Sequence, residues 1–238
     1  MQRSWSWIAV RLVAACAVVF LVMWGLGKLL THVLVHGWVG HTDDSIERGL
    51  LADRTPFWNT VTKAVTWLAE PLTVEVALVV LVVAIAVATR RLAPALFLAL
   101  TVGIESGIYF VVSTLDHRPR PSIPRQGIGD PVASYPSGHV AASICLYGGL
   151  AVLAWVLTRR RALQVTLTVL AVVIPPAVGL CRMYRGFHHL SDVIAGAILG
   201  LVWLTATTRI LLLRAPQPAT RRAPADAAEP RPAGRFAV

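Results

Sequence analysis

The chain is punctuated by two polar stretches, DHRPRPSIPRQGIGDPVASYPSGH at residues 116–139 and CRMYRGFHHLSD at residues 181–192. The sequence around them is almost wholly apolar, so arginine, histidine, aspartate, serine and glycine concentrate next to hydrophobic segments. Ionisable groups are costly to hold at a membrane edge, and their presence there indicates a site for a polar substrate. The two stretches therefore predict helical spans that end at one shared polar site.

The composition is typical of a membrane protein. Of the 238 residues, 56% are hydrophobic and 14% are charged, whereas soluble domains average about 25% charged residues. The net charge of +10 is compatible with nucleic-acid binding, but the basic residues punctuate apolar runs or lie near the C-terminus. No basic face with interleaved aromatic residues is found, so we predict no nucleic acid among the partners, only membrane lipids and a polar substrate.

Six apolar runs are long enough to cross a bilayer, for which about 20 residues suffice. They cover residues 5–35, 72–89, 92–114, 139–157, 163–180 and 190–213. The first run also has the basic start of a signal peptide, but no small-x-small cleavage site follows, and we interpret it as the first span. Pro175-Pro176 is expected to break or kink the fifth span, and Gly196-x3-Gly200 is a candidate close-packing face on the sixth.

The remaining segments complete the expected architecture. Residues 56–68 place apolar side chains at helical spacing and predict an amphipathic helix lying against the bilayer, with a lid over the site as the alternative. Residues 214–238 are rich in proline, alanine and arginine and predict a disordered basic cytoplasmic tail. We therefore expect an all-α polytopic membrane helical bundle over residues 1–213, with six transmembrane helices and one additional interfacial helix, followed by the tail.

The arginines predict which side of the membrane each loop faces. With six spans, one side receives Arg3, Arg90, Arg91, Arg159, Arg160, Arg161 and Arg214. The positive-inside rule makes that side cytoplasmic, together with both termini. The two polar stretches then lie together at the extracytoplasmic face, because one follows the third span and the other follows the fifth.

The first polar stretch contains two groups suited to phosphate. In Arg118-Pro119-Arg120-Pro121 the prolines keep the backbone out of helix, and the guanidinium forks match phosphate oxygens. Tyr135-Pro136-Ser137-Gly138-His139 immediately precedes an apolar run. We expect proline to begin that helix, Ser137 and Gly138 to leave backbone N–H groups accessible to an anion, and His139 to stand beside the anion.

The second polar stretch supplies a candidate nucleophile. Asp192 follows His188 by four residues, so in a helix its carboxylate can reach one imidazole nitrogen and leave the other free to attack. Arg182 precedes His188 by six residues and offers a further cation. Each residue alone has a simpler explanation, with Arg182 or Asp192 capping a helix and His188 or His189 lying at the interface. Their joint occurrence favours catalysis.

The order Arg-Pro, Pro-Ser-Gly-His and Arg-x5-His-x3-Asp resembles the three signature motifs of the type 2 phosphatidic acid phosphatase superfamily, over residues 113–192. The resemblance implies a membrane phosphatase in which His188 attacks phosphorus, oriented by Asp192, and His139 protonates the departing oxygen. Water then releases a phosphohistidine intermediate. The resemblance also implies a phosphate site that needs no metal cofactor, formed by Arg118, Arg120, Ser137, Gly138 and Arg182.

The sequence departs from the family pattern at two positions. The lysine that usually precedes the first motif's Arg-Pro pair by seven residues is Ser113 here, and we take Arg118 as its candidate substitute. The serine that usually precedes the arginine of the third motif is Cys181. Glu105, inside the third run, either positions an arginine of the first motif or makes a helix-helix hydrogen bond.

The expected substrate is a lipid phosphate. An isoprenoid pyrophosphate such as undecaprenyl pyrophosphate and a phosphatidate-like lipid both fit an outward-facing site beside the bilayer. The alternative is a catalytically silent lipid-phosphate binding or transport protein, which the missing lysine favours. A vanadium haloperoxidase uses the same anion site, but the family's haloperoxidases are soluble, and the six spans count against that activity. No feature of the sequence predicts an oligomeric state.

Overall fold

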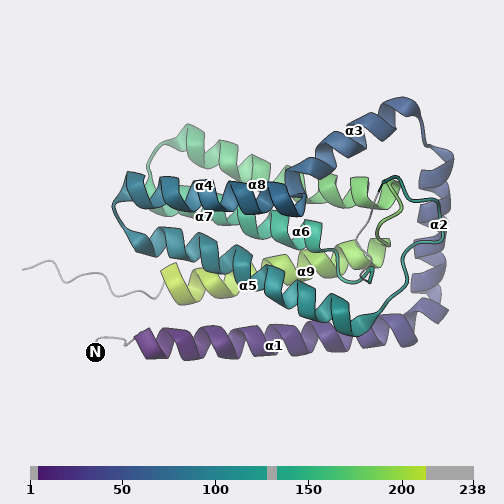
Figure 1. The fold of residues 1–238 in the computed structure, drawn as a ribbon, viewed down its shortest axis with the longest axis horizontal. Coiled ribbons are helices and arrows are strands. Elements are labelled where there is room, and N and C mark those ends of the chain that lie inside the picture. The colour runs from purple at the N-terminus through teal and green to yellow at the C-terminus, as the bar shows by residue number, and fades with distance from the viewer. Residues whose placement is uncertain (1–4, 128–132, 213–238) are drawn as a thin grey trace, which may run out of the picture.

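The computed structural model describes residues 5–127 and 133–212, and the predicted basic tail lies outside them. Within these residues six helices are long and apolar enough to cross a membrane, and no strand occurs. They run side by side as one bundle (Figure 1). The predicted all-α, six-span architecture is thereby confirmed, and the protein is a multi-pass membrane protein.

The spans coincide closely with the predicted apolar runs. They are α1 (Trp5–His32), α4 (Pro71–Thr89), α5 (Leu92–Asp116), α6 (Gly138–Ser143) joined to α7 (Gly149–Leu157) by a π-helical turn (Ile144–Gly148), α8 (Arg161–Tyr184), and α9 (Leu190–Thr207) with a π-helical turn at its end (Thr208–Leu212). The helix α8 continues through Pro175 and Pro176, so of the two expectations a break is wrong and a kink stays a prediction. Proline is tolerated inside a membrane helix because neighbouring groups satisfy the carbonyls that it frees.

Two further helices lie across one end of the bundle, α2 (Trp38–Ala52) and α3 (Pro56–Thr66), with short 3₁₀ turns at Leu34–His36 and Trp67–Ala69 (Figure 1). The helix α3 is the predicted interfacial helix, and it begins where Thr55 caps the Trp58 N–H and Pro56 takes the first position. The helix α2 was not predicted. Its buried side includes Asp43 and Glu47, so it has no apolar periodicity to reveal it.

The helices α6 and α9 pack so closely that glycine is required between them. A Cβ atom on Gly196 would lie 2.4 Å from the carbonyl oxygen of Ser137, and one on Gly200 would lie 2.9 Å from that of Ala141. Both obstacles are backbone atoms, which cannot rotate away. The candidate close-packing face at Gly196-x3-Gly200 is therefore confirmed, and it brings the Pro-Ser-Gly-His segment against the third motif.

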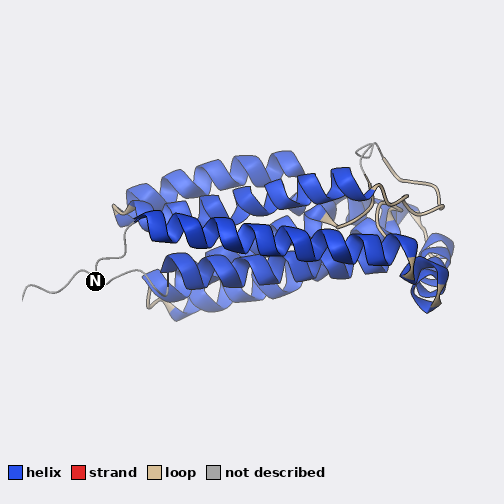
Figure 2. Ribbon diagram, turned by 90° about the horizontal axis from the view of Figure 1, so that it is seen from below, coloured by secondary structure: helices blue, strands red, loops and turns tan. Residues whose placement is uncertain are grey.

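The loops that carry the motifs gather at the end of the bundle covered by α2 (Figure 2). The connections from α4 to α5 and from α7 to α8, which contain Arg90, Arg91 and the arginines at 159–161, lie at the opposite end (Figure 1). An even number of spans between the motifs is what places them together. The assignment of the two ends to the extracytoplasmic and cytoplasmic sides stays a prediction.

Candidate active site

Arg118 lies behind the expected phosphate site and binds two carboxylates. It follows the end of α5, where His117 takes a left-handed conformation (φ 54°). Its Nη2 is 3.0 Å from Asp43 Oδ2 on α2, and its Nη1 contacts Asp192 Oδ1 and lies 2.8 Å from Ser191 Oγ. The guanidinium is almost fully buried among these groups. These contacts use three of the five guanidinium N–H groups and match the charge of Arg118 with two carboxylates. The expectation that Arg118 replaces the missing lysine as a phosphate ligand stays a prediction.

The helix α2 docks onto the third motif through polar contacts. Asp43, besides accepting from Arg118, accepts from the backbone N–H of Ser191 at 3.1 Å and from its hydroxyl at 2.5 Å. Glu47, one turn along α2, contacts His189 Nδ1. Both carboxylates are buried. Acidic residues four apart also occur on solvated helix faces, so the sequence alone did not reveal this interface.

His189 faces an acceptor at each ring nitrogen. Its Nδ1 contacts Glu47, and its Nε2 lies 3.1 Å from the carbonyl oxygen of Pro119. Burial lowers the pKa of His189, but the hydrogen bond to Glu47 and the charge of Asp192 outweigh it, so the pKa is raised overall. A protonated imidazole can donate to both acceptors, which a neutral imidazole cannot. His189 therefore belongs to the layer that supports the site.

Asp192 does not contact His188 directly, contrary to the sequence prediction. Residues 185–189 form a turn, with Gly186 at φ 76°, and α9 begins only at Leu190, so the helical four-residue spacing does not apply. Asp192 instead accepts from the backbone N–H of His189 at 2.9 Å, from Ser134 Oγ and from Arg118. The carbonyl of that same Ser134 lies 2.7 Å from His188 Nδ1. Asp192 thus positions His188 through Ser134.

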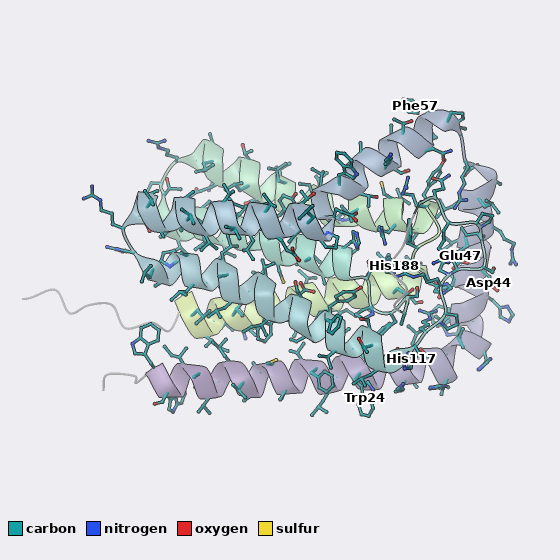
Figure 3. All side chains as sticks on the ribbon, viewed as in Figure 1. Trp24, Asp44, Glu47, Phe57, His117 and His188 are labelled. Atoms are coloured by element: carbon teal, nitrogen blue, oxygen red, sulfur yellow. The ribbon has the colours of Figure 1, made fainter. Side chains whose placement is uncertain are left out.

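His188 lies buried at the α2 end of the bundle (Figure 3). Because a carbonyl only accepts, Nδ1 carries the proton and Nε2 keeps its lone pair. Burial lowers the pKa of His188 well below its ordinary value, and the charges of Arg182, Arg120 and His139 lower it further. The hydrogen bond to the Ser134 carbonyl raises the pKa, but by less. The imidazole is therefore neutral at neutral pH and is held in the tautomer that a nucleophile needs.

Two of the predicted arginines flank the ring that precedes His188. The Cζ atom of Arg182 lies 4.0 Å from the Phe187 ring centroid, and that of Arg120 lies 6.0 Å from it. Arg120 also donates to the Phe187 carbonyl at 2.7 Å. The predicted grouping of these two cations with His188 is seen in the structure.

The Pro-Ser-Gly-His segment brings Ser137 and Gly138 to the same site. Ser137 takes the N-cap position of α6, but its side chain makes no capping hydrogen bond. Its backbone N–H donates to the Asp192 carbonyl at 3.0 Å, so this N–H is not available to an anion, contrary to the prediction. Its hydroxyl oxygen is buried and has no hydrogen-bond partner among the described residues. Gly138 lies against the Tyr109 ring, where a Cβ would approach to 2.8 Å. Buried polar groups are normally hydrogen-bonded, and a bound ligand can supply the partner that this hydroxyl lacks.

His139 is paired with a carboxylate that the sequence gave no reason to select. Its Nε2 lies 3.4 Å from Glu70 Oε2, just before α4. The hydrogen bond from His139 lowers the pKa of Glu70, so this carboxylate is ionised and accepts that hydrogen bond. Glu70 is half-buried beside His139. It belongs to neither polar stretch and to no motif, so the sequence did not single it out.

Two cavities adjoin at the Glu70–His139 pair. One, of about 590 Å³, is lined by Glu70, Arg182 and Phe187 together with side chains of α3. The other, of about 410 Å³, is lined by His139 and by mostly apolar residues of α4 and α5. Glu105 also borders the second cavity, and its carboxylate oxygens have no hydrogen-bond partner in the described part of the chain, so neither predicted contact is seen.

Comparison with known proteins agrees with these features. The model of the PAP2 superfamily matches residues 94–215, just over half of the chain. The probable lipid phosphate phosphatase 4 of Arabidopsis thaliana is 36% identical over 76 residues, and this match spans 29% of the chain and only 24% of the plant protein. The crystal structure of a PAP2-type phosphatidylglycerolphosphate phosphatase from Bacillus subtilis shares the fold, with a TM-score of 0.68, 22% identity and coverage of 81% of this chain and 94% of that one. The chain belongs to the PAP2 superfamily.

Proposed function

We propose that the protein is an integral membrane phosphatase that hydrolyses a lipid phosphate or lipid diphosphate through a phosphohistidine on His188. The observation that carries the proposal is the neutral, buried His188, whose Nδ1 is held by the Ser134 carbonyl while Arg120 and Arg182 stand beside it. This arrangement combines an activated nitrogen nucleophile with cations for a phosphoryl group. Membership of the PAP2 superfamily supports the same chemistry.

The first step forms a bond between His188 Nε2 and the terminal phosphorus and breaks the bond from that phosphorus to the oxygen of the leaving group, which is the lipid alcohol of a monophosphate or the lipid monophosphate of a diphosphate. Arg120 and Arg182 neutralise the charge on the transferred oxygens, and the unpartnered Ser137 hydroxyl donates to one of them. Gly138 lets the Tyr109 ring pack against the start of α6, and its backbone N–H is a further donor to the phosphoryl group. The departing oxygen takes the proton that His139 otherwise shares with Glu70.

The second step restores the enzyme. Water adds to phosphorus as the nitrogen–phosphorus bond breaks, its proton passes to His139, and inorganic phosphate leaves. Asp192 keeps His188 in one orientation throughout, through Ser134. Because arginines neutralise the phosphoryl oxygens, we propose that the reaction needs no metal ion.

A lipid substrate is favoured by the apolar cavity beside His139. The cavity lies between α4 and α5, which are both spans, so an acyl or isoprenoid chain can extend from it into the bilayer. We propose that this domain comprises residues 1–213 and that the site faces the extracytoplasmic side, since the arginine-bearing loops lie at the opposite end. The substrate is an undecaprenyl pyrophosphate-like or a phosphatidate-like lipid.

The test is release of inorganic phosphate by the detergent-purified protein, with EDTA present, from undecaprenyl pyrophosphate and from phosphatidate. Release by the wild type and its loss in His188→Ala support the proposal. The alternative of a silent lipid-phosphate binder has one observation in its favour, the buried Ser113 in place of a lysine. Lipid binding without phosphate release by the folded wild type would establish that alternative.

A further inference from the structure

Neither Ser113 nor an unpaired Arg118 supplies the positive charge that the family's lysine gives near the first motif. Ser113, at the position of the family's lysine, is fully buried, and its hydroxyl donates to the Phe110 carbonyl of its own helix at 3.0 Å. Arg118 is bound by Asp43 and Asp192. Beyond Arg120 and Arg182, a cation whose charge is not matched by buried carboxylates therefore comes from elsewhere in the chain.

The cavity of about 590 Å³ receives two further cations. Lys63 of α3 and Arg185, just past the end of α8, line it together with Arg182. The carboxylate that also lines this cavity is Glu70, which is hydrogen-bonded to His139 and is close enough to Arg182 and Arg185 for their charges to lower its pKa. Lys63 is exposed, so its ammonium group is free to move to a bound anion.

The contacts of Asn59 fix α3 over this cavity. Its side-chain oxygen accepts from Gln126 Nε2 at 2.7 Å and from the Tyr184 hydroxyl at 3.0 Å. Arg185 donates to the Asn59 carbonyl at 3.4 Å and also contacts the carbonyl of Gln126. Because Lys63 follows Asn59 by four residues, it lies on the same side of α3, one turn along. The two cations are thus held over one cavity by a shared set of contacts.

We propose that Lys63 and Arg185 bind a second phosphate group, so that the protein acts preferentially on lipid diphosphates rather than on lipid monophosphates. This inference rests on the proposed phosphatase function. Arg120 and Arg182 take the phosphate that His188 attacks. The second phosphate leaves with the lipid, past His139. The cavity of about 590 Å³, which Lys63 and Arg185 line, and the mostly apolar cavity of about 410 Å³ adjoin at the Glu70–His139 pair. Lys63 and Arg185 neutralise the charge of that leaving group as its bond to phosphorus breaks.

The experiment compares kcat/KM for phosphate release from a polyprenyl diphosphate and from the monophosphate of the same chain. Lys63→Met removes the charge and keeps the length of the side chain, Lys63→Arg keeps the charge, and Ala64→Met is a control on an exposed neighbour. We expect Lys63→Met to lower kcat/KM for the diphosphate by about tenfold or more, the worth of one charge-assisted hydrogen bond. The kcat/KM of Lys63→Met for the monophosphate should change by less than about threefold, the scale of a surface substitution. The kcat/KM values of Lys63→Arg and Ala64→Met should change by no more than this on either lipid.

Equal losses on both lipids, or no loss on either, would overturn the inference. No phosphate from either lipid with wild-type protein would instead refute the phosphatase proposal. A second measurement does not depend on turnover, namely the stabilisation of the purified protein against thermal unfolding by inorganic pyrophosphate and by inorganic phosphate. Pyrophosphate should stabilise the wild type more than phosphate does, and Lys63→Met should lose most of that difference. Equal stabilisation by the two anions in the wild type would contradict the second phosphate site.

Discussion

Arg118 and Asp192 form a buried ion pair, and Asp43 of α2 binds the other terminal nitrogen of the same guanidinium. Asp192 in turn holds Ser134, whose carbonyl accepts the Nδ1 proton of His188. The orientation of the nucleophile therefore depends on a helix that contributes no residue to any family motif. This arrangement separates the residues that bind phosphate from those that hold the site together.

Arg118→Ala should chiefly lower the stability of the fold, whereas Arg120→Ala should chiefly abolish phosphate release. Removal of Arg118 leaves Asp43 and Asp192 buried without their cation, which typically costs about 3–5 kcal/mol. The Arg118 variant should therefore unfold at a markedly lower temperature in detergent. Arg120→Ala should keep nearly the wild-type unfolding temperature and lose phosphate release. Equal stability of the two variants, with equal loss of activity, would return Arg118 to the phosphate site.

Asp43→Asn should reduce turnover although Asp43 touches no substrate. Asparagine keeps the shape but removes the charge that Arg118 requires, and the expected loss of stability is about 1–3 kcal/mol. Because the change reaches His188 only through Arg118, Asp192 and Ser134, kcat should fall with little change in KM. The matched control is Asp44→Asn, since Asp44 is exposed on the same helix. A control variant as impaired as Asp43→Asn would contradict the positioning role.

The raised pKa of His189 predicts how stability depends on pH. A histidine whose pKa is higher in the folded state stabilises the fold fully below its unfolded pKa of about 6.5 and loses that contribution as pH rises through the folded pKa. Glu47→Gln removes the main cause of the increase. The wild type should exceed this variant in unfolding temperature by more at about pH 6 than at about pH 9. A difference that is the same at both pH values would show that His189 is not protonated.

Gly196→Ala should damage both the fold and the site. The new Cβ would lie 2.4 Å from the Ser137 carbonyl oxygen, so α9 must move away from α6. Overpacking of this kind costs about 1–3 kcal/mol, and the shift separates Ser137 from Asp192. Gly107→Ala is the control, because a Cβ there meets nothing within 4 Å. Thermal unfolding and phosphate release of both variants provide the measurement, and a Gly196 variant as stable as its control would refute the close packing.

The spans and the grouping of the motifs could be predicted because hydropathy and parity determine them. The apolar runs specify six crossings, and an even number of crossings between motifs places them at one end. Arg120, Arg182, His139 and His188 were recognised from motif spacing and do meet at one site. This part of the site depends on short-range patterns that a single sequence displays.

The contacts around Arg118 and Asp192 could not be predicted for two physical reasons. The spacing argument assumed that residues 188–192 are helical, but the Gly186 turn delays the start of α9 until Leu190. One carboxylate partner of Arg118 comes from α2, 75 residues away in the chain, and the other from α9. The helix α2 buries carboxylates instead of apolar side chains. Glu70 and Lys63 are single polar residues whose positions become meaningful only when α3 and α4 are placed beside the site.

The account rests on His188 as a covalent nucleophile, and the most direct measurement is a search for its phosphorylated form. Purified protein is mixed with a lipid substrate labelled in the transferred phosphate, quenched in alkali during turnover, digested and sequenced by mass spectrometry. Label on the peptide that contains His188, stable to alkali and lost in acid, is the predicted result, with none in His188→Gln. Undiminished phosphate release by His188→Gln, or label on another residue of the folded wild type, would contradict the account.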